Sequence, residues 1–496
     1  MAFGVVWLSL LAYASLAPPV DNIEQLTWVR SLEWGYYKHP PLPTFLLWLP
    51  TKLLGLSAGT SYLVGATVTL TAVGLLWRLL VPLRGRTYAT LALLAALCIT
   101  FYNGRLYYYN HNVVLMLMVV ASAACCWRAF DQRRLVWWVC TGIVLGLGAL
   151  TKYQIAVTAT SLVCFWVSQR AWRDPVHVRG LGLAALSALL IFLPHLLWLR
   201  DHAFGPIHYA IESSLGASLG ASERLWNAVH WEADALLNRA LPAVVFLLAC
   251  GYAVHRRSNA SPRPNVCTTP TNADPAKALI LCWGLVPLIF MPLVGITFGS
   301  DLQLQWGTPF LAFVAPSLME LKAAAFWNRV HLPFALKLFV PIQVLLLLIN
   351  YLTSPLGVQA FKDTHWRNFP SERLAKQVAE PARGRLGRPV SIVVGPPEES
   401  GALALLLPEH PLILIDGRYE WCPWVPRKLL ADCGGVQIIR APKPPRGYSA
   451  LGPRFPGLHW RVIEPTSAAR TCPVQAPQRI ADAPVRNPPT LAQGIE

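Results

Sequence analysis

The sequence predicts a membrane protein built from α-helices, followed by a water-soluble α/β domain at the C-terminal end. Of its 496 residues, 54% are hydrophobic and only 14% are charged, and the mean hydropathy is +0.42. Long apolar runs recur through roughly the first 350 positions, whereas Pro, Gly and Arg become frequent after them. A chain this long and this apolar does not fit into a single soluble core, so lipid is expected to surround its first part.

The apolar runs have about the length of a membrane-spanning helix, which needs ~20 residues to cross ~30 Å of hydrocarbon. We expect about eleven such helices in this chain. Run 135–168 is counted as two helices, because one helix of ~34 residues would be ~50 Å long. The chain is therefore expected to turn near Lys152. Stretch 42–56 carries two prolines and a lysine, and we expect it to lie at the interface without crossing. The predicted spans are 1–17, 59–81, 87–103, 113–129, 135–150, 153–168, 180–199, 238–254, 278–297, 308–322 and 333–352.

The distribution of Lys and Arg over alternate loops predicts the orientation. With the N-terminus inside, the loops that face the cytoplasm carry the excess of basic residues. An odd number of crossings then places the C-terminal part outside, in the periplasm of a bacterium, with the helices in its inner membrane. The net charge of +17 therefore reflects topology and not nucleic-acid binding. The small residues at 12–17 leave open a second interpretation, in which the first run is a cleaved signal peptide.

We divide the chain into a transmembrane part, 1–354, an external α/β domain, 355–465, and a Pro- and Ala-rich tail, 466–496, which is expected to be disordered. The transmembrane part includes an outer loop at 18–58. In the external domain, strands expected at 390–395, 412–415 and 436–440 alternate with helices expected at 372–380, 399–407 and 424–431. Cys422 and Cys433 are close in sequence, and we expect them to form a disulfide in an oxidising compartment.

Charged and aromatic residues gather in the first outer loop. Asp21 and Glu24 are three residues apart, so a short helix would place both carboxylates on one face. The segment YYKHPPL follows at 36–42, and further polar residues are predicted on the same side of the membrane. Cations and aromatic rings on one membrane face are typical of a site for an anionic headgroup, although solvated loop charges would look similar. The remaining candidates at this face are Tyr37, Lys38, His39, Arg105, His111, Asn112 and Lys152.

Four segments give the chain a family resemblance. They are the acidic pair with His39–Leu42 (HPPL), then Gly146–Lys152 (GLGALTK), 192–209 (FLPHLLWLRDHAFGPIHY) and 304–310 (LQWGTPF). In this order they resemble the multi-spanning, polyprenyl-phosphate-dependent glycosyltransferases of family 39. That family includes the aminoarabinose and galacturonic acid transferases of lipopolysaccharide and the protein O-mannosyltransferases. The last two segments look like those of the lipopolysaccharide-directed branch.

The resemblance implies a fold, a reaction and roles for the candidate residues. The fold would be that of a C-type glycosyltransferase. The reaction would move a sugar, with inversion, from an undecaprenyl or other polyprenyl phosphate to lipid A, lipopolysaccharide, a glycan or a protein. Asp21 would act as the base or stabilise the oxocarbenium ion, and Glu24 would assist it. The leaving phosphate would be held by Lys38 or His39 together with Arg105 and Lys152.

The chain departs from the family pattern at the start of the fourth helix. Many relatives carry an Asp there, whereas this chain has Asn110, His111 and Asn112, with Asn112 in the matching place. Because a charge is lost, no cofactor is predicted with certainty, and a divalent cation is left open. His111 is interpreted equally well as a polar residue that begins a helix.

Two other classes of function stay open. A transporter or flippase for a lipid-linked sugar would share the apolar bulk and the cations, but transporters usually carry polar residues near the bilayer midplane. A binding or scaffold subunit with a degenerate site is the third interpretation. Lys152 has an alternative role of its own, in which it only extends its ammonium group to the interface.

Overall fold

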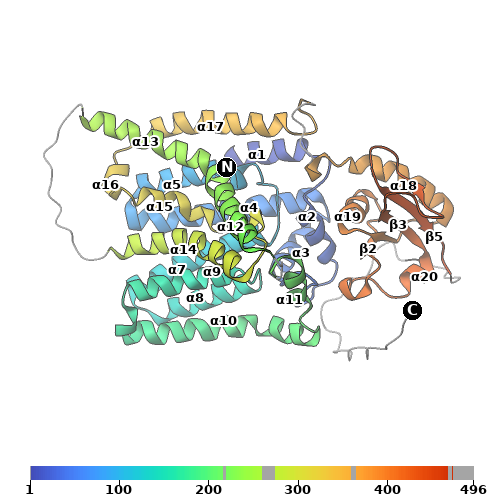
Figure 1. Cartoon of the computed structure of the whole chain (residues 1–496), viewed down its shortest axis with the longest axis horizontal. Helices are drawn as coiled ribbons and strands as arrows, with labels where there is room; N and C mark the ends of the chain where they lie inside the picture. The colour runs from blue at the N-terminus through green and yellow to red at the C-terminus, as the bar shows by residue number, and fades with distance from the viewer. Residues whose placement is uncertain (1, 216–218, 260–273, 359–364, 467–471, 473–496) are drawn as a thin grey trace. The chain divides into compact units, whose positions relative to one another are not determined.

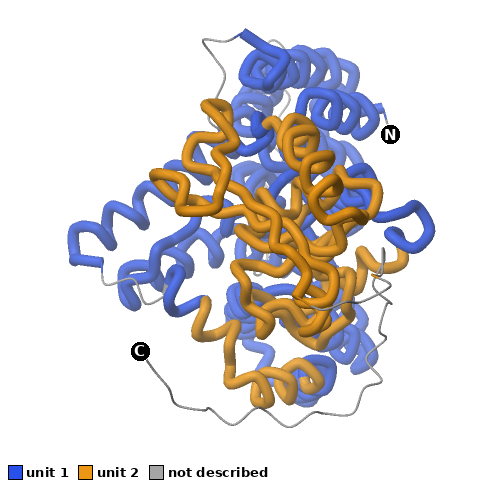
Figure 2. Tube along the Cα trace, turned by 90° about the vertical axis from the view of Figure 1, so that its right-hand side faces the viewer, with its two compact units in different colours: residues 1–22, 50–192, 210–369 blue, residues 23–49, 193–209, 370–496 orange. Residues whose placement is uncertain are grey.

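The computed structural model describes residues 2–215, 219–259, 274–358, 365–466 and 472. The chain divides into two compact units, each assembled from separate stretches of sequence (Figure 2). Unit 1 comprises residues 1–22, 50–192 and 210–369, and unit 2 comprises 23–49, 193–209 and 370–496. The first outer loop therefore contributes to unit 2, together with the C-terminal part of the chain.

Unit 1 is helical, and Figure 1 shows its long helices α4, α5, α7, α8, α14 and α17 running in roughly the same direction. Helices at the boundaries of the ranges above contribute residues to both units. The helices of the first 354 residues are α1 (Ala2–Tyr13), α2 (Val20–Trp28), α3 (Leu42–Leu54), α4 (Ala58–Arg84), α5 (Arg86–Cys98), α6 (Thr100–Asn103), α7 (His111–Gln132), α8 (Leu135–Ala149), α9 (Ile155–Ser168), α10 (Pro175–Asp201), α11 (Gly205–Ala210), α12 (Ala221–Ala233), α13 (Leu241–Asn259), α14 (Pro275–Phe298), α15 (Val314–Met319), α16 (Ala324–Trp327) and α17 (Leu332–Leu352).

Local sequence signals explain where several of these helices begin. The Asn110 side chain accepts the N–H of Val113 at the start of α7, and Asp274 caps α14 ahead of a proline at the first helical position. The predicted turn near Lys152 is confirmed, because α8 ends at Ala149 and α9 begins at Ile155.

The predicted run 308–322 departs most from a continuous helix. Residues 308–322 contain Pro309 and Pro316, which lack the N–H that a helix interior needs. The structure has one short 3₁₀ turn here, Leu311–Phe313, followed by the six-residue α15. Run 87–103 is divided at Ile99 into α5 and α6, and run 238–254 begins in the π-helix Asp234–Arg239 before α13. Each remaining predicted run coincides with one helix.

Five helices among the described residues are long and apolar enough to cross a membrane: α4, α7, α10, α14 and α17. Residues 221–239 and 241–256 form a pair bent by 53°, which is either a sixth span that is broken or a re-entrant loop. Shorter apolar helices, α1, α5, α8 and α9, occupy other predicted runs, and α3 occupies the stretch expected at the interface. The chain is a multi-pass membrane protein.

Unit 2 contains a five-stranded mixed sheet with the strand order β2-β1-β3-β5-β4. The strands are β1 (Ile392–Gly395), β2 (Leu412–Ile415), β3 (Gly435–Arg440), β4 (Ser449–Ala450) and β5 (Leu458–Ile463). Strands β2, β1 and β3 are parallel, whereas β5 is antiparallel to both of its neighbours. The sequences IVVG and LILI of β1 and β2 are buried throughout, as expected of parallel strands.

Most of the predicted elements of the external part are present in unit 2. The helices are α18 (Ser371–Leu386), α19 (Pro397–Leu406) and α20 (Leu429–Cys433). The helix predicted over 424–431 is wrong at its start, because Pro426 interrupts it and α20 begins only at Leu429. The short strand β4 and the strand β5 were not predicted. Of the predicted tail 466–496, only Thr466 and Cys472 lie within the described residues.

The core of unit 2 joins the first outer loop to the sheet. Trp28 is fully buried and stacks on Tyr36, with ring centroids 4.6 Å apart. Both rings belong to one hydrophobic cluster with side chains of β1 and β2, including Ile392 and Ile413. Close packing extends to α19, where a Cβ on Gly401 would meet the Ile23 side chain at 2.0 Å. The loop is therefore an integral part of the core that contains the sheet.

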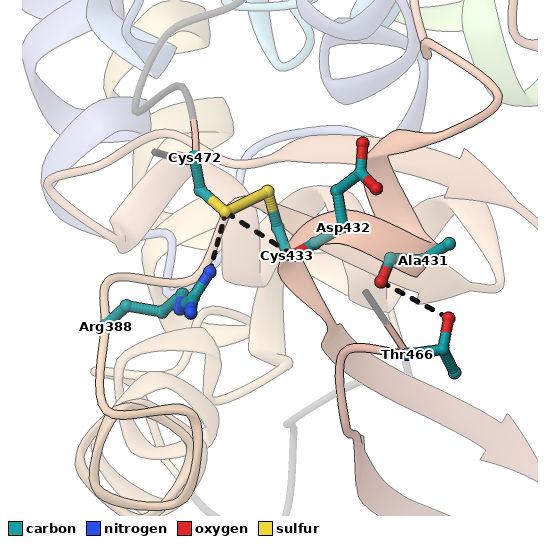
Figure 3. Close-up of a disulfide and its surroundings, with 6 residues drawn as sticks. All are labelled: Arg388, Ala431, Asp432, Cys433, Thr466 and Cys472. Atoms are coloured by element: carbon teal, nitrogen blue, oxygen red, sulfur yellow. Dashed lines mark hydrogen bonds between the residues drawn. A yellow bond between two sulfur atoms is a disulfide. The ribbon is translucent and has the colours of Figure 1, made fainter. Parts of the chain in front are cut away.

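The disulfide of unit 2 joins Cys433 to Cys472, with Cα atoms 5.7 Å apart (Figure 3). The predicted pair of Cys422 and Cys433 is wrong. Cys422 is buried in the hydrophobic cluster, where its sulfur accepts the N–H of Ile415 at 3.2 Å. Cys433 ends α20, where its sulfur is within reach of Cys472. Arg388 donates to the sulfur of Cys472 at 2.9 Å.

We expect peptide mapping to recover this pairing from the full-length protein. After unfolding without reductant, a thiol reagent should label Cys422 and leave Cys433 and Cys472 unlabelled. A linked Cys433–Cys472 peptide should appear by mass spectrometry and disappear on reduction. Equal labelling of all three cysteines, or a linked Cys422–Cys433 peptide, would contradict the structure.

Candidate active site

The buried side chain of Asn22 fixes the first turn of α2. Its amide nitrogen donates to Ser61 Oγ and to the carbonyl oxygen of Tyr107, both at 2.9 Å. Its amide oxygen accepts the backbone N–H of Tyr109 at 2.8 Å. Asn22 is 0% exposed, so these hydrogen bonds replace those that water would make. They hold the start of α2 against α4 and against segment 107–109.

Asp21 precedes Asn22 and is positioned by the same anchor. Its Oδ2 accepts a hydrogen bond from Nδ2 of Asn110 at 2.8 Å. The other end of the Asn110 amide accepts the N–H of Val113 and caps α7, so a helix cap orients the carboxylate. Asp21 is half-buried. A carboxylate has about four acceptor positions, so Asp21 retains the capacity to accept a proton or a further hydrogen bond.

Lys152 lies in the turn between α8 and α9. Its Nζ donates to Oδ1 of Asn112 at 2.8 Å and lies 5.2 Å from the centroid of the Trp306 ring. Burial lowers the pKa of Lys152 to about 7, and the negative charge of Asp21 acts in the opposite direction. The two charges are therefore near enough to interact within unit 1. A nearby phosphate would raise this pKa and favour the charged ammonium.

Arg105 lines a cavity that Lys152 does not line. Its guanidinium lies 4.8 Å from the centroid of the Phe101 ring and 5.2 Å from that of Tyr108. It lines a cavity of about 350 Å³ to which Asp21, Asn112 and Lys152 do not contribute. His111 is the first residue of α7 and is buried. The structure thus brings Asp21, Asn112 and Lys152 together and places Arg105 elsewhere in unit 1.

Glu24 lies one helical turn beyond Asp21 on α2 and belongs to unit 2. Its carboxylate forms a salt bridge with Nζ of Lys38 at 2.8 Å, and it accepts a hydrogen bond from the Tyr37 hydroxyl at 3.4 Å. Burial has the largest single effect on the pKa of Lys38 and lowers it, but the Glu24 carboxylate, with smaller contributions from Tyr37 and Tyr209, raises the pKa above its ordinary value. The pair therefore stays ionised, and Glu24 neutralises the lysine that was predicted to hold phosphate.

Tyr37 and His39 pack within aromatic clusters of unit 2. The Tyr37 ring stacks on Trp421, with centroids 4.4 Å apart and an interplanar angle of 9°. Tyr209 meets the same ring edge-on at 5.8 Å. The His39 ring lies edge-on to Trp28 at 6.3 Å. Tyr37 is thus surrounded by rings from three separate stretches of sequence.

Four residues of these clusters were given no role from the sequence. Asn110 had a usable signal, because an Asn directly before an apolar helical run is typical of an N-cap. Asn22 had a weaker signal as a polar residue beside the acidic pair. Trp306 and Trp421 had none, because their positions depend on contacts with residues far away in sequence.

The donor set around Asp21 was tested for a metal ion. The Asp21 carboxylate is hydrogen-bonded to the amide of Asn110, and its neighbour in the chain is Asn22. In the described part of the chain, no group of three or more His, Cys, Asp or Glu side chains is arranged to hold a metal ion. The described residues around Asp21 therefore do not fit a metal ion.

Comparison with known proteins identifies the fold. ArnT from Cupriavidus metallidurans bound to undecaprenyl phosphate superposes with a TM-score of 0.59 over 96% of this chain and 98% of that one, at 15% identity. The C-type glycosyltransferase fold is the fold of this chain. The apo state of the same ArnT gives a TM-score of 0.51 over 92% and 96% of the two chains, also at 15% identity. The predicted fold class is confirmed.

Two sequence comparisons agree with the C-type glycosyltransferase fold. Residues 38–198 match the family described as dolichyl-phosphate-mannose-protein mannosyltransferase. The lipopolysaccharide core galacturonosyltransferase RgtB of Rhizobium johnstonii is 36% identical over 75 residues. That match covers 15% of this chain and 15% of RgtB, so the chain spans a small part of the length of this relative. The predicted family resemblance is confirmed for the matched region.

The hydrogen bonds of Asn22 lead to a prediction about stability. We expect Asn22→Ala to lower the thermal midpoint of the purified protein, because an unsatisfied buried N–H, such as that of Tyr109, costs ~1–3 kcal/mol. Ser61→Ala is the matched control. It removes one partner of Asn22 and leaves the N–H of Tyr109 paired, so its effect should be smaller. Equal midpoints for Asn22→Ala and wild type would show that these bonds do not anchor α2.

The environment of Lys152 leads to a prediction about its titration. Competitive amine labelling, read by mass spectrometry across a pH series, should give Lys152 a midpoint near pH 7. Asp21→Asn should move the midpoint lower, because the carboxylate that favours the ammonium is removed. A midpoint near the ordinary lysine value of about 10.4, unchanged in Asp21→Asn, would contradict the buried position and its link to Asp21.

Proposed function

We propose that the chain is an inverting glycosyltransferase that moves a sugar from undecaprenyl phosphate, or another polyprenyl phosphate, to an acceptor at the membrane surface. The observation that carries this proposal is the pairing of a hydrogen-bonded carboxylate, Asp21, with an ammonium group, Lys152, inside one unit of this fold. The transfer needs an acceptor-side base or anion and a cation for the leaving phosphate.

The proposed reaction is a single displacement at the anomeric carbon of the sugar. An acceptor oxygen forms the new bond to this carbon as the bond to the phosphate oxygen breaks. The electron pair of that bond stays with the polyprenyl phosphate, whose growing charge is stabilised by the ammonium of Lys152. The proton of an acceptor hydroxyl passes to Asp21. An acceptor phosphate is already anionic, and Asp21 then stabilises positive charge on the sugar.

We propose a structural role for Glu24 and Lys38, the charged pair of unit 2. Lys38 is neutralised by Glu24, so we assign this pair the role of holding the loop that carries Tyr37 and His39. Glu24 is thereby a positioning residue and not a second base.

The relatives support the choice of substrates. ArnT was solved with undecaprenyl phosphate bound, and RgtB is named as a transferase that acts on the lipopolysaccharide core. We therefore propose undecaprenyl phosphate as the lipid carrier and lipid A or the lipopolysaccharide core as the acceptor. Glycans and proteins are the remaining acceptor classes.

We propose that the reaction takes place on the periplasmic side of the bacterial inner membrane. The charge bias of the loops supports this orientation. The disulfide between Cys433 and Cys472 supports an oxidising compartment for unit 2. In this arrangement residues 1–354 form the transferase part in the membrane, and 355–465 form a periplasmic domain.

A transporter for a lipid-linked sugar is the second candidate. Transporters place their polar residues near the middle of membrane helices. Here Asp21 lies in the first turn of the short helix α2, and Lys152 lies in a turn between two helices. These positions at helix ends favour the transferase.

The role of Asp21 is tested by Asp21→Asn, which keeps the shape and removes the charge. We expect sugar transfer to fall by ~100- to 10,000-fold, the range for loss of a general base, while the thermal midpoint stays near wild type. The assay would use purified protein in nanodiscs, a polyprenyl-phosphate sugar pool and lipopolysaccharide from a deletion strain. Asp131→Asn, at an exposed position near the end of α7, is the matched control and should retain activity. If Asp21→Asn transfers sugar at the wild-type rate, Asp21 is not the general base.

The role of Lys152 is tested by a pair of substitutions. Lys152→Ala should lower turnover by ~100- to 1,000-fold, because one charge-assisted donor to the developing charge is lost. Lys152→Arg should restore part of the rate, limited by its larger planar head. If Lys152 only extends to the interface, the alanine variant will show near-normal turnover, and the phosphate must then be held by other groups.

A further inference from the structure

Unit 1 contains a cavity of about 350 Å³ that gathers three arginines. Arg105 comes from the segment before α7, Arg239 from the bend between residues 221–239 and 241–256, and Arg367 from the segment after α17. His365 and Tyr108 also line it. The three arginines are more than 100 residues apart in sequence, so the fold, and no local motif, brings these cations together.

The cavity carries an excess of positive charge. Arg105 and Arg239 stack on the same Phe101 ring, at 4.8 Å and 4.2 Å from its centroid. Asp234 forms a salt bridge with Arg239 at 2.8 Å. Among the described residues, no carboxylate lies within salt-bridge distance of Arg105. Two guanidinium groups on one ring, with a carboxylate beside one of them, form a site suited to an anion.

Arg367 and Tyr108 complete the polar wall. Arg367 is buried and donates to Asn350 at 3.0 Å and to Thr353 at 2.6 Å. The hydroxyl of Tyr108 is 3.2 Å from Nε2 of His365. Asn350 lies in the last turn of the membrane-spanning helix α17, and Thr353 directly follows it. One wall of the cavity is therefore formed at the end of a helix that is long and apolar enough to cross a membrane, and the end of such a helix reaches the lipid headgroups.

The cavity is also adjacent to the proposed base. Tyr107 lines it, and the carbonyl oxygen of Tyr107 accepts the hydrogen bond from Asn22, the neighbour of Asp21. Asp21 and Arg105 both interact electrostatically with Tyr108. Asp21 thus has Lys152 as one charged neighbour and lies close to the arginine cavity through Tyr107 and Tyr108.

We propose that this cavity is the acceptor subsite and that it binds a phosphate monoester of the acceptor. This inference rests on the proposed function, and it assigns Arg105 to the acceptor and not to the donor phosphate. Several planar guanidinium groups match the oxygens of a phosphate, whereas a neutral sugar needs no such cluster. A volume of about 350 Å³ is near the lower end of the ~300–1,000 Å³ typical of small-molecule sites, so it accommodates a headgroup or one phosphorylated sugar.

Binding of two probes tests the proposal without any sugar transfer. The first probe is phosphatidic acid in nanodiscs of phosphatidylcholine, and the second is soluble glucose 1-phosphate. Wild-type protein should bind at least one of them, as measured by native mass spectrometry or calorimetry. Binding of phosphatidic acid alone would assign a lipid headgroup, and binding of glucose 1-phosphate would assign a phosphorylated sugar. Binding of neither probe would overturn the proposal.

Variants locate the binding. We expect the double variant Arg105→Gln/Arg239→Gln to bind the probe at least about tenfold more weakly, because two charge-assisted donors are lost. Arg105→Lys keeps the charge and should retain part of the binding. Arg461→Gln is the matched control, since Arg461 is half-buried and lies 4.7 Å from the Tyr448 ring in unit 2. Equal probe binding by the double variant and wild type would overturn the proposal, as would equal losses in the double variant and in Arg461→Gln.

Binding of undecaprenyl phosphate separates this inference from the proposed function. Lys152→Ala should weaken undecaprenyl phosphate binding and leave probe binding unchanged, and Arg105→Gln/Arg239→Gln should do the opposite. If both ligands are lost in both variants, there is one anion site and the acceptor subsite is refuted. If the two losses separate but wild-type protein transfers no sugar to any acceptor, the cavity stands and the proposed function fails.

Discussion

The candidate site depends on one buried amide. Asn22 has no access to water, and its hydrogen bonds to Ser61, Tyr107 and Tyr109 fix where α2 begins. Because Asp21 is the adjacent residue, the same bonds place its carboxylate against the cap of α7. Burying a polar group costs free energy unless all of its hydrogen bonds are made. Only an arrangement that keeps these partners of Asn22 in place is therefore stable. These hydrogen bonds therefore fix the position of the first turn of α2 relative to the charged residues near it.

The charged residues near the start of α2 differ in their surroundings, and we propose different roles for them. Lys152 is a single ammonium in a buried turn, with a pKa low enough to respond to a bound anion. The arginine cavity presents several planar cations. Glu24 neutralises Lys38, so the acidic pair of α2 is split between two tasks. One carboxylate faces the proposed chemistry, and the other stabilises the loop.

The sequence was sufficient where local patterns decide the structure. Apolar run lengths predicted the helices, and buried β-branched runs predicted the parallel strands 392–395 and 412–415. The disulfide partner of Cys433 was not predictable, because it depends on the tertiary fold. Cys433 bonds to Cys472, whereas Cys422 is enclosed in the hydrophobic core. The same reason explains why Arg239 and Arg367 were missed as partners of Arg105. Asp21 and Lys152 could be proposed from the sequence because each lies in a contiguous segment that carries the family resemblance.

A structure of the full-length protein in nanodiscs with undecaprenyl phosphate, determined by electron cryomicroscopy, tests the central claim most directly. The account predicts density for the phosphate within hydrogen-bond distance of Nζ of Lys152, close to Asp21. It also predicts that this lipid leaves the cavity of Arg105, Arg239 and Arg367 free. A phosphate bound among these three arginines, with Lys152 remote from it, would contradict the account.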